Sequence, residues 1–267
     1  MKIALQLIDK PDPAVIDQLP FPWDGYLADG IEYASAAIAL EQTPGPAFTM
    51  MEVGAGWGPW TALLAKLAQR KGFETIRTVA IEASRARFEL LQLHLFNNGL
   101  LPTPHATEAR VGPVHTKLLN GAGWWRDTTL FFPAEGGTQD AGMAAQEKNR
   151  SSDYRGLPIQ NQRVRAYSIG GLVNDLEKVD FLHFDVQGSE WEILKHSKRV
   201  LDKKVRFMFV GTHSRQIEGD IVGLFLGKNW KLFREKPCRF YGMADAPTLP
   251  GLTHLDGGQL WRNMSLS

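Results

Sequence analysis

The sequence is organised around the stretch Met50-Met51-Glu52-Val53-Gly54-Ala55-Gly56-Trp57-Gly58-Pro59-Trp60. Residues 48–53 are mostly apolar, which predicts a buried strand of a parallel sheet. Glycines at positions 54, 56 and 58 permit backbone angles and close approaches that a side chain would block. Pro59 suits the first position of a helix, because no amide hydrogen is needed there. The stretch therefore predicts a strand, a glycine hinge and a helix.

Two kinds of ligand commonly bind at such a turn, and the residues around it favour one of them. The dinucleotide fingerprint G-x-G-x-x-G needs a glycine where this chain has Pro59, and the spacing here is G-x-G-x-G. Glu52 would repel a pyrophosphate but attract the ammonium and sulfonium of S-adenosylmethionine, whose carboxylate could meet amide hydrogens at the helix start. The hinge thus favours S-adenosylmethionine, with an ordinary tight turn as the alternative.

Length and composition bound the possibilities. We expect 267 residues, 43% of them hydrophobic, to form one α/β domain, and a net charge of +1 gives no reason to expect nucleic acid or an anionic membrane as a partner. A single cysteine, Cys238, excludes an internal disulfide framework and a multi-cysteine metal site. No apolar run approaches the length of a membrane span. These features predict a soluble, cytoplasmic protein.

Strand and helix patterns alternate along the chain. They predict helices at 26–40, 59–71, 85–97, 169–176, 189–195 and 217–225, and strands at 48–53, 75–81, 105–111, 179–184 and 205–210. We expect residues 1–46 to form a helical cover over one sheet edge or a lid. Residues 230–234 and 259–261 could form a final antiparallel pair, and Ser189 with Glu192 has the spacing of a capping box. The alternation predicts a parallel sheet with helices on both faces.

Several residues are expected at the carboxyl ends of these strands, where ligands bind in such folds. Glu82 follows the strand next to the hinge, where a carboxylate can accept hydrogen bonds from a ribose diol, as in both S-adenosylmethionine and nicotinamide enzymes. Ala109 is small enough to let an adenine ring lie against the backbone, or it fills a tight core. Asp185 and His213 follow what should be adjacent strands.

Residues 113–163 break the alternation, with scattered glycines and few periodic apolar residues. Segments of this length are usually functional or disordered. Trp124 and Trp125 offer large flat surfaces within it. We expect this insert to bind the acceptor substrate through the two tryptophans, or to be a hairpin that they pack.

Four motifs in this order resemble the FkbM-type methyltransferases. They are Glu52-Val53-Gly54-Ala55-Gly56-Trp57-Gly58, Ala80-Ile81-Glu82-Ala83, Asp185-Val186-Gln187-Gly188-Ser189-Glu190 and Asp256-Gly257-Gly258-Gln259-Leu260-Trp261. The resemblance implies a Rossmann-like, seven-strand sheet with an antiparallel last strand, and methyl transfer to a hydroxyl of a saccharide or small natural product. It also implies cofactor contacts from Glu52, Gly54, Ala55, Gly56, Gly58, Glu82, Ala83 and Asp185.

Methyl transfer to a hydroxyl benefits from a base, and His213 and Asp185 are the two candidates. A free histidine has the more suitable pKa, roughly 6.5. The same two residues could contribute ligands to a divalent metal, but Gln187 and Gly211 stand where further carboxylates would have helped, so we do not expect a required metal.

The sequence is also compatible with two other functions. One is a nicotinamide-dependent oxidoreductase, and the other is a non-catalytic module that binds the donor. The sequence lacks a basic stripe, which argues against nucleic acid as the acceptor. It does not identify the acceptor or the oligomeric state.

Overall fold

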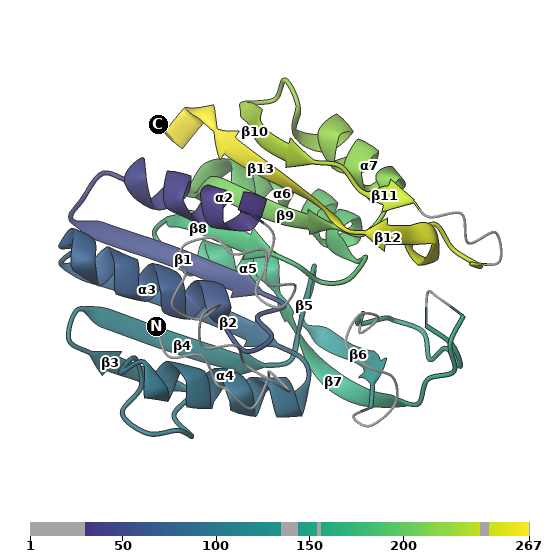
Figure 1. Ribbon diagram of the computed structural model, residues 1–267, viewed down its shortest axis with the longest axis horizontal. Coiled ribbons are helices and arrows are strands. Elements are labelled where there is room, and N and C mark those ends of the chain that lie inside the picture. Colours follow the sequence, from purple (N-terminus) through teal and green to yellow (C-terminus); the bar gives the residue numbers. More distant parts are fainter. Residues whose placement is uncertain (1–29, 135–143, 154–155, 241–245, 267) are drawn as a thin grey trace, which may run out of the picture.

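The computed structural model describes residues 30–134, 144–153, 156–240 and 246–266. An eight-stranded sheet forms its centre, in the order β10-β13-β9-β8-β1-β2-β4-β3 (Figure 1). Five neighbouring strands run parallel: β9 (Val205–Thr212), β8 (Val179–Phe184), β1 (Ala47–Val53), β2 (Thr75–Glu82) and β4 (Val114–Asn120). Three strands complete it: β13 (Gly257–Asn263), antiparallel to β9 and to β10 (Trp230–Lys236), and β3 (Glu108–Val111), antiparallel to β4.

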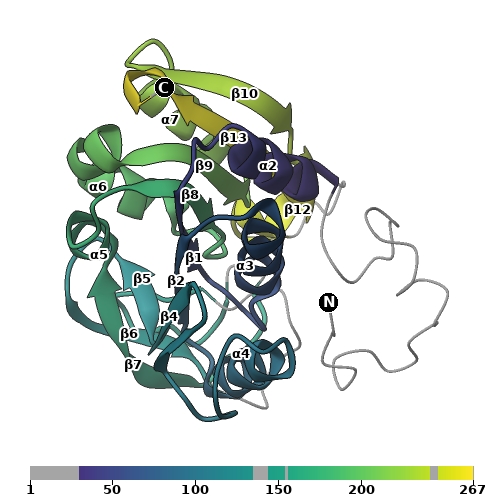
Figure 2. The same ribbon diagram turned by 90° about the vertical axis from the view of Figure 1, so that its left-hand side faces the viewer.

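Helices cover both faces of this sheet (Figure 2). One layer contains α2 (Gly30–Glu41), α3 (Pro59–Lys71) and α4 (Arg85–Asn97), and the other contains α5 (Ile169–Asn174), α6 (Glu190–Lys204) and α7 (Arg215–Phe225). Successive residues of β1 point to opposite faces of the sheet and pack against different helix layers. In β1, Phe48 and Met50 pack with α3, whereas Met51 and Val53 pack with α5 and α6. Both faces of the strand are therefore apolar, as predicted for a central parallel strand.

Local signals in the sequence place the first helices correctly. Pro59 begins α3 directly after Gly58, whose φ is 76°, and Gly72 ends it with a φ of 87°. Ser84 caps α4 by accepting a hydrogen bond from the backbone N–H of Arg87, and Ser168 caps α5 in the same way. The predicted mostly parallel α/β sheet, with helices on both faces and an antiparallel last strand, is confirmed.

The strand pattern differs from the prediction near residue 113. The strand predicted at 105–111 covers only Glu108–Val111 and lies at the sheet edge. Gly112, with a φ of 57°, and Pro113 reverse the chain into β4, where Val114, Thr116 and Leu118 alternate as buried residues. The sheet therefore has eight strands rather than seven, and the segment that leaves it begins at residue 121 rather than 113.

The predicted N-terminal cover is described only in part. Residues 1–29, including the start of the helix predicted at 26–40, lie outside the described part of the chain. The described helix α2 packs over β8, β9 and β13 and also contacts the edge strand β10. No described helix is long and apolar enough to cross a bilayer.

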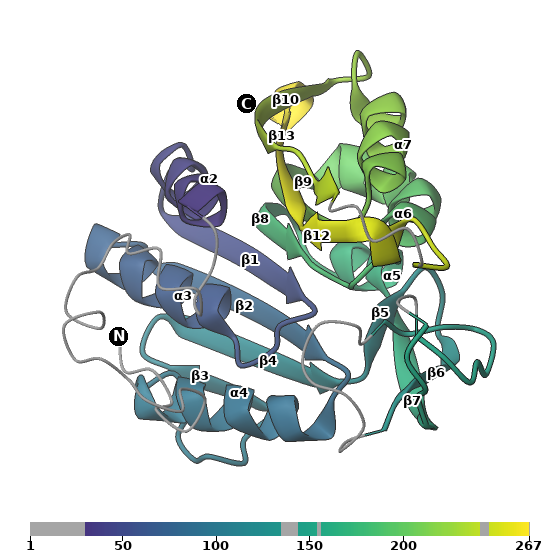
Figure 3. The same cartoon turned by 45° about the vertical axis from the view of Figure 1, so that its right-hand side comes forward.

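Much of the predicted insert forms a small second sheet beside the main one (Figure 3). Its order is β5-β7-β6, comprising β5 (Ala122–Trp124), β7 (Asn161–Ser168) and β6 (Thr128–Pro133). A two-stranded ribbon of β11 (Arg239–Phe240) and β12 (Thr253–Leu255) precedes β13. Short 3-10 turns lie at Pro250–Leu252 and Met264–Leu266.

The packing around β13 predicts a large effect of one substitution. Trp261 is 0% exposed and contacts the ring of Phe225, with 5.7 Å between centroids. Trp261→Ala should lower the free energy of unfolding by roughly 3–5 kcal/mol in urea denaturation, because it leaves a cavity. Met264→Ala, at a side chain 47% exposed, should change it by about 0.5 kcal/mol or less. Equal effects of the two changes would contradict this account of the core.

Candidate functional site

The carboxyl ends of β1 and β8 meet in the middle of the sheet, and from this point the strand order runs outward in both directions (Figure 3). Ligands of doubly wound folds bind in the crevice at such a switch point. Here the backbone N–H of Asp185 donates to the carbonyl oxygen of Val53 at 2.9 Å. A Cβ at Gly54 would overlap the carbonyl oxygen of Asp185. The hinge and Asp185 therefore share one confined space.

The other two hinge glycines serve different purposes. Gly58 has a φ of 76°, and a Cβ there would overlap the side chain of Leu91 in α4. Gly56 has a φ of 56°, but a Cβ there would meet no protein atom within 4 Å. Space beside Gly56 is thus open, while Gly54 and Gly58 are closed by the protein itself. Ala55, between them, is buried at 2% exposure.

Glu82 braces the hinge from the end of β2. Its carboxylate accepts hydrogen bonds from the backbone N–H groups of Gly56 and Ser84, both at 2.7 Å. The side chain is buried, and burial raises its pKa despite these hydrogen bonds. Ala83 next to it is half-buried. Glu82 lies where the sequence predicts it, at the carboxyl end of the strand beside the hinge.

Glu52 does not offer a free carboxylate to a ligand, contrary to the sequence-based expectation. Its side chain is 1% exposed and accepts hydrogen bonds from the backbone N–H and the hydroxyl of Thr61, in the first turn of α3. Burial raises its pKa to about 7, although His183 and Thr61 oppose the shift. The reason is strand alternation, which puts Glu52 on the same face as Phe48 and Met50, under α3.

A histidine beneath the hinge extends this buried polar network. His183 in β8 is 3% exposed and stacks on Trp60 and Phe209, each with ring centroids 5.2 Å apart. Its Nε2 lies 3.0 Å from Glu32 of α2. Burial lowers the pKa of His183, but Glu32 and Glu52 outweigh burial and raise it. The network ties α2 and α3 to the centre of the sheet.

Asp185 reaches the surface of the crevice with its side chain 34% exposed. Its Oδ1 accepts a hydrogen bond from the side-chain amide of Gln187 at 2.9 Å and lies 3.3 Å from Nε2 of His213. Gln187 has a φ of 59°, an uncommon angle for a residue with a side chain. Burial raises the pKa of Asp185, but His213 outweighs it and lowers the pKa to about 2. Asp185 is therefore ionised.

His213 lies between two carboxylates and is 3% exposed. Its Nδ1 is 2.8 Å from Oε1 of Glu190, and its Nε2 faces Asp185. Burial lowers the pKa of His213, but the charges of Glu190 and Asp185 raise it well above the usual value. Both ring nitrogens therefore face carboxylates, and the role of His213 as a base stays a prediction.

Glu190 holds the loop after Asp185 in place of the predicted capping box. The Ser189 side chain makes no capping hydrogen bond and instead donates to the carbonyl oxygen of Ala145. Oε1 of Glu190 accepts hydrogen bonds from the backbone N–H groups of Val186 and Gly188. Glu190 is 0% exposed, so this carboxylate is an internal support of the loop.

Asp256, just before β13, is a third acid near His213. Its Oδ2 lies 3.9 Å from Nε2 of His213. Burial raises the pKa of Asp256, as do Asp185 and Glu190, although His213 lowers it. Potential ligand atoms of Asp185, Glu190 and His213 lie within 4.8 Å of one another, so this cluster has the chemistry to hold a cation.

The other residues expected at the site lie elsewhere. Ala109 is in the edge strand β3, opposite Thr116, and packs against the core beneath α4 rather than at the end of a central strand. Trp124 is 6% exposed and donates to Glu147. Trp125 stacks on His196, with 4.6 Å between ring centroids, and lies under the guanidinium of Arg126. Trp125 thus packs against α6, and Trp124 is linked to Glu147 within the small-sheet region.

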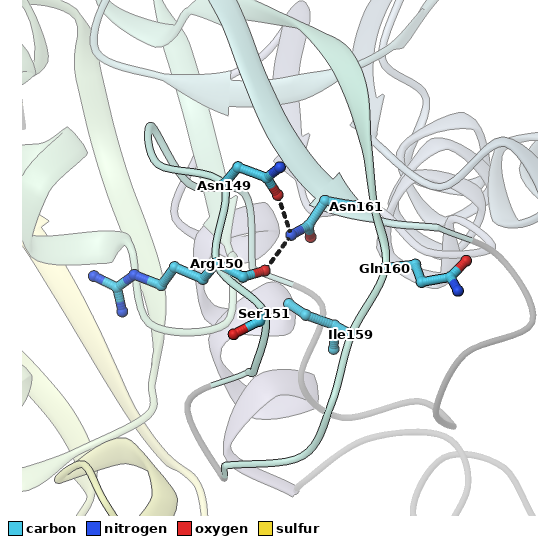
Figure 4. Close-up of a pocket in the computed structure, with 6 residues that line it drawn as sticks. All are labelled: Asn149, Arg150, Ser151, Ile159, Gln160 and Asn161. Carbon is cyan, nitrogen blue, oxygen red and sulfur yellow. Dashed lines mark hydrogen bonds between the residues drawn. The ribbon is translucent and has the colours of Figure 1, made fainter.

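A separate hollow lies in the small-sheet region (Figure 4). Asn161 crosses it and donates to the side chain of Asn149 at 2.9 Å and to the carbonyl oxygen of Arg150 at 2.6 Å. Asn149, Arg150, Ser151, Ile159, Gln160 and Asn161 line the hollow, and none of them belongs to the Asp185–His213 cluster.

Sequence reasoning missed the roles of Glu190, Asp256 and Thr61. Glu190 and Asp256 belong to the motifs at residues 185–190 and 256–261, but the motifs do not reveal which residues these acids contact. Glu190 stands at the start of a helix, five residues after Asp185, and an acid at such a position can accept hydrogen bonds from backbone N–H groups of the preceding loop. No comparable local signal exists for Asp256, because its contact with His213 depends on how β13 pairs with β9.

Comparisons with known proteins identify the family to which the chain is similar. The family model described as "Methyltransferase FkbM domain" matches residues 52–227. A curated protein of Jannaschia sp. (strain CCS1), provisionally named a methyltransferase, is 26% identical over 253 residues, covering 92% of this chain and 83% of its own length.

Two solved structures show weaker likenesses. Methyltransferase FkbM of Methylobacillus flagellatus KT is 13% identical with a TM-score of 0.45, covering 82% of this chain and 45% of that one. The precorrin-6y C5,15-methyltransferase of Geobacter metallireducens GS-15 is 12% identical with a TM-score of 0.44, covering 88% and 89%. Likenesses at this level say nothing about the acceptor of this chain.

Burial of Glu52 predicts a pH dependence of stability. Between its ordinary pKa of 4.5 and the folded value of about 7, the folded protein keeps a proton that the unfolded chain releases. The free energy of unfolding should therefore fall as the pH rises across this window, with at most about 3 kcal/mol from Glu52. Urea denaturation of Glu52→Gln at several pH values should show a shallower slope.

The raised pKa of Glu82 lowers stability as the pH rises above 4.5, and that of His183 does so above 6.5, so part of the slope should persist in Glu52→Gln. Glu89→Gln is the matched control, since the Glu89 side chain is 57% exposed. It should retain the slope of the unmodified protein. An undiminished slope in Glu52→Gln would contradict the assignment.

Proposed function

The chain belongs to the FkbM methyltransferase family, and on that premise we propose that it is an S-adenosylmethionine-dependent O-methyltransferase. Its acceptor is proposed to be a hydroxyl group of a saccharide or another small natural product. The observation that carries the proposal is the open space beside Gly56, whose backbone N–H donates to the buried carboxylate of Glu82.

The residues around that space fit the donor. Gly56 leaves room for a ligand to approach the backbone, and Glu82 stands at the strand end where a ribose diol is usually bound. Asp185 would face the sulfonium. Its carboxylate belongs to a cluster of three acids around one imidazole, which favours a positively charged ligand over a pyrophosphate. From the sequence, this attraction was expected of Glu52, but the carboxylate of Glu52 is buried under α3.

S-adenosylmethionine would supply a methyl group on a positively charged sulfur, which an oxygen takes in one in-line displacement. As the new C–O bond forms, the C–S bond breaks, its electron pair stays on sulfur, and the acceptor oxygen loses its proton. The protein can contribute most by holding the two reactants in line, a term worth about 7–11 kcal/mol in well-oriented systems. The close contact between Gly54 and the backbone of Asp185 would fix these two segments in place, and so help to hold the reactants in line.

Acceptor choice is proposed to lie with the chain beyond residue 121. Residues 144–147 come close to the Asp185 loop, since the hydroxyl of Ser189 donates to the carbonyl oxygen of Ala145. We propose this segment, in place of Trp124 and Trp125, as the part of the predicted insert that meets the acceptor. Trp124 contacts this segment through its hydrogen bond to Glu147.

A module that binds the donor without chemistry is the second candidate. It is favoured by the surroundings of His213, because both ring nitrogens of this candidate base already face the carboxylates of Asp185 and Glu190. The two candidates share the donor site and differ in turnover, so they require separate measurements.

Donor binding can be tested with a matched pair of glycine substitutions. Gly56→Ala should weaken the binding of S-adenosylhomocysteine about tenfold or more in calorimetric titration, because its Cβ enters the open space. Gly72 also has a positive φ and open surroundings, but it lies at the far end of α3. Gly72→Ala should carry the same backbone penalty, about 1–2 kcal/mol of stability, and leave the affinity unchanged.

Tighter binding of NAD than of S-adenosylhomocysteine, or equal affinities in the two glycine variants, would overturn the donor assignment. Turnover is tested by transfer of a labelled methyl group to a panel of hydroxylated saccharides and natural products. A labelled O-methyl product supports the enzyme. Donor binding without product across the panel supports the binding module.

A further inference from the structure

One face of the small sheet presents arginines to solvent. Side chains alternate along β7, so that Ala166 is buried in the core while Arg163 and Arg165 are exposed on the opposite face. In the neighbouring strand β6, Phe131 pairs with Arg163 and Thr129 pairs with Arg165. Residues that pair across two strands point to the same face of a sheet. These residues therefore form one surface.

Both guanidinium groups on this surface lie over aromatic rings. The guanidinium carbon of Arg165 is 4.6 Å from the ring centroid of Tyr167, and that of Arg163 is 5.9 Å from the ring centroid of Phe131. Such contacts use the flat side of the guanidinium and leave the N–H donors along its edge available to a ligand. We call these four side chains the arginine face, and its two cations are held in place before any ligand arrives.

No described carboxylate offsets these two charges. Within the part of the chain that the structure describes, neither guanidinium has an ion-pair or hydrogen-bond partner. The exposed acids of the small-sheet region are engaged elsewhere. Glu147 pairs with Arg126 at 3.2 Å, and Asp127 accepts a hydrogen bond from the backbone N–H of Ser168 at 2.9 Å. Because arginine stays charged at neutral pH, the arginine face favours a negatively charged ligand.

One end of the arginine face lies beside the strand end that carries Glu82. A Cβ at Gly121 would come within 2.7 Å of the ring of Tyr167, so this ring lies over Gly121. The backbone N–H of Gly121 donates to the carbonyl oxygen of Glu82 at 2.8 Å. At the other end of β7, Asn161 borders the hollow of Figure 4, and by strand alternation it shares the face of the two arginines. The face thus leads from the crevice towards this hollow.

A second connection joins the arginine face to the Asp185 loop. Phe131 and Gln146 exchange two backbone hydrogen bonds, each 2.8 Å long. The residue before Gln146 is Ala145, whose carbonyl oxygen accepts the hydrogen bond from Ser189. Strands in a sheet are spaced about 4.8 Å apart, so two such steps separate residue 146 from β7 by roughly 10 Å. The arginine face is therefore close to the segment proposed to meet the acceptor.

We propose that the arginine face binds an oxyanion of the acceptor, a phosphate or a carboxylate, through the guanidinium groups of Arg163 and Arg165. Arginine recognises both groups with paired N–H donors. The inference rests on the proposed function, because it gives the acceptor saccharide a negative charge. A nucleic acid also carries phosphates, but its binding depends on many basic contacts, and the net charge of this chain is only +1.

Three small probes test the arginine face in the full chain, with and without S-adenosylhomocysteine. In calorimetric titration, glucose 6-phosphate and glucuronate should bind about tenfold or more tightly than glucose, which has the same ring without a charge. The double variant Arg163→Gln/Arg165→Gln should lose this preference. Arg234→Gln is the matched control, because Arg234 is an exposed arginine stacked at 5.0 Å on Phe233 in β10. It should retain the preference of the unmodified protein.

Thermal unfolding of each variant verifies that it is folded. Equal binding of glucose and its two charged derivatives would overturn the proposal, as would a preference that survives in the double variant. Tighter binding of a single-stranded RNA oligonucleotide at the same two arginines would overturn it in favour of nucleic acid.

Failure of this inference can be distinguished from failure of the proposed function. If the chain binds S-adenosylhomocysteine and transfers a labelled methyl group to neutral saccharides in preference to charged ones, only the arginine face is wrong. If S-adenosylhomocysteine does not bind but the preference for charged probes depends on the two arginines, the anion site stands and the proposed function is wrong.

Discussion

The close approach of two chain segments at the centre of the sheet governs the rest of the molecule. The carbonyl oxygen of Asp185 occupies the place where residue 54 would carry a side chain. This approach arises because β1 and β8 are parallel neighbours at the point where the strand order diverges. It brings the glycine hinge and the Asp185 loop into one crevice, and Glu82, Glu190 and His213 are arranged around that crevice.

Buried glutamates act as internal supports of this crevice, and the aspartates remain available at its surface. Glu52, Glu82 and Glu190 are 1%, 5% and 0% exposed, and each accepts hydrogen bonds from backbone N–H groups of a loop or helix start. Backbone amides near a carboxylate satisfy part of the cost of its burial. Asp185 and Asp256 extend further into solvent. The longer acids thus shape the site, and the shorter ones can meet a ligand.

The sequence predicts the parts of this arrangement that depend on neighbours along the chain. The strand, hinge and helix around residues 50–60, the serine caps of α4 and α5, and the positions of Glu82 and Asp185 at strand ends all follow from local patterns. Alternation along β1 also assigns Glu52 to the face that carries Phe48 and Met50, under α3. The meeting of Asp256 with His213 could not be predicted, because it depends on the register between two distant strands.

The place of β13 in the sheet has a consequence for biosynthesis. This strand is the last of the described sheet strands to leave the ribosome, yet it lies between β9 and β10, which are made earlier. Until it arrives, both neighbours have an unpaired edge, and unpaired strand edges readily associate with other chains. The nascent polypeptide must therefore be protected or fold quickly at this stage, and Asp256 joins His213 only when the gap has closed.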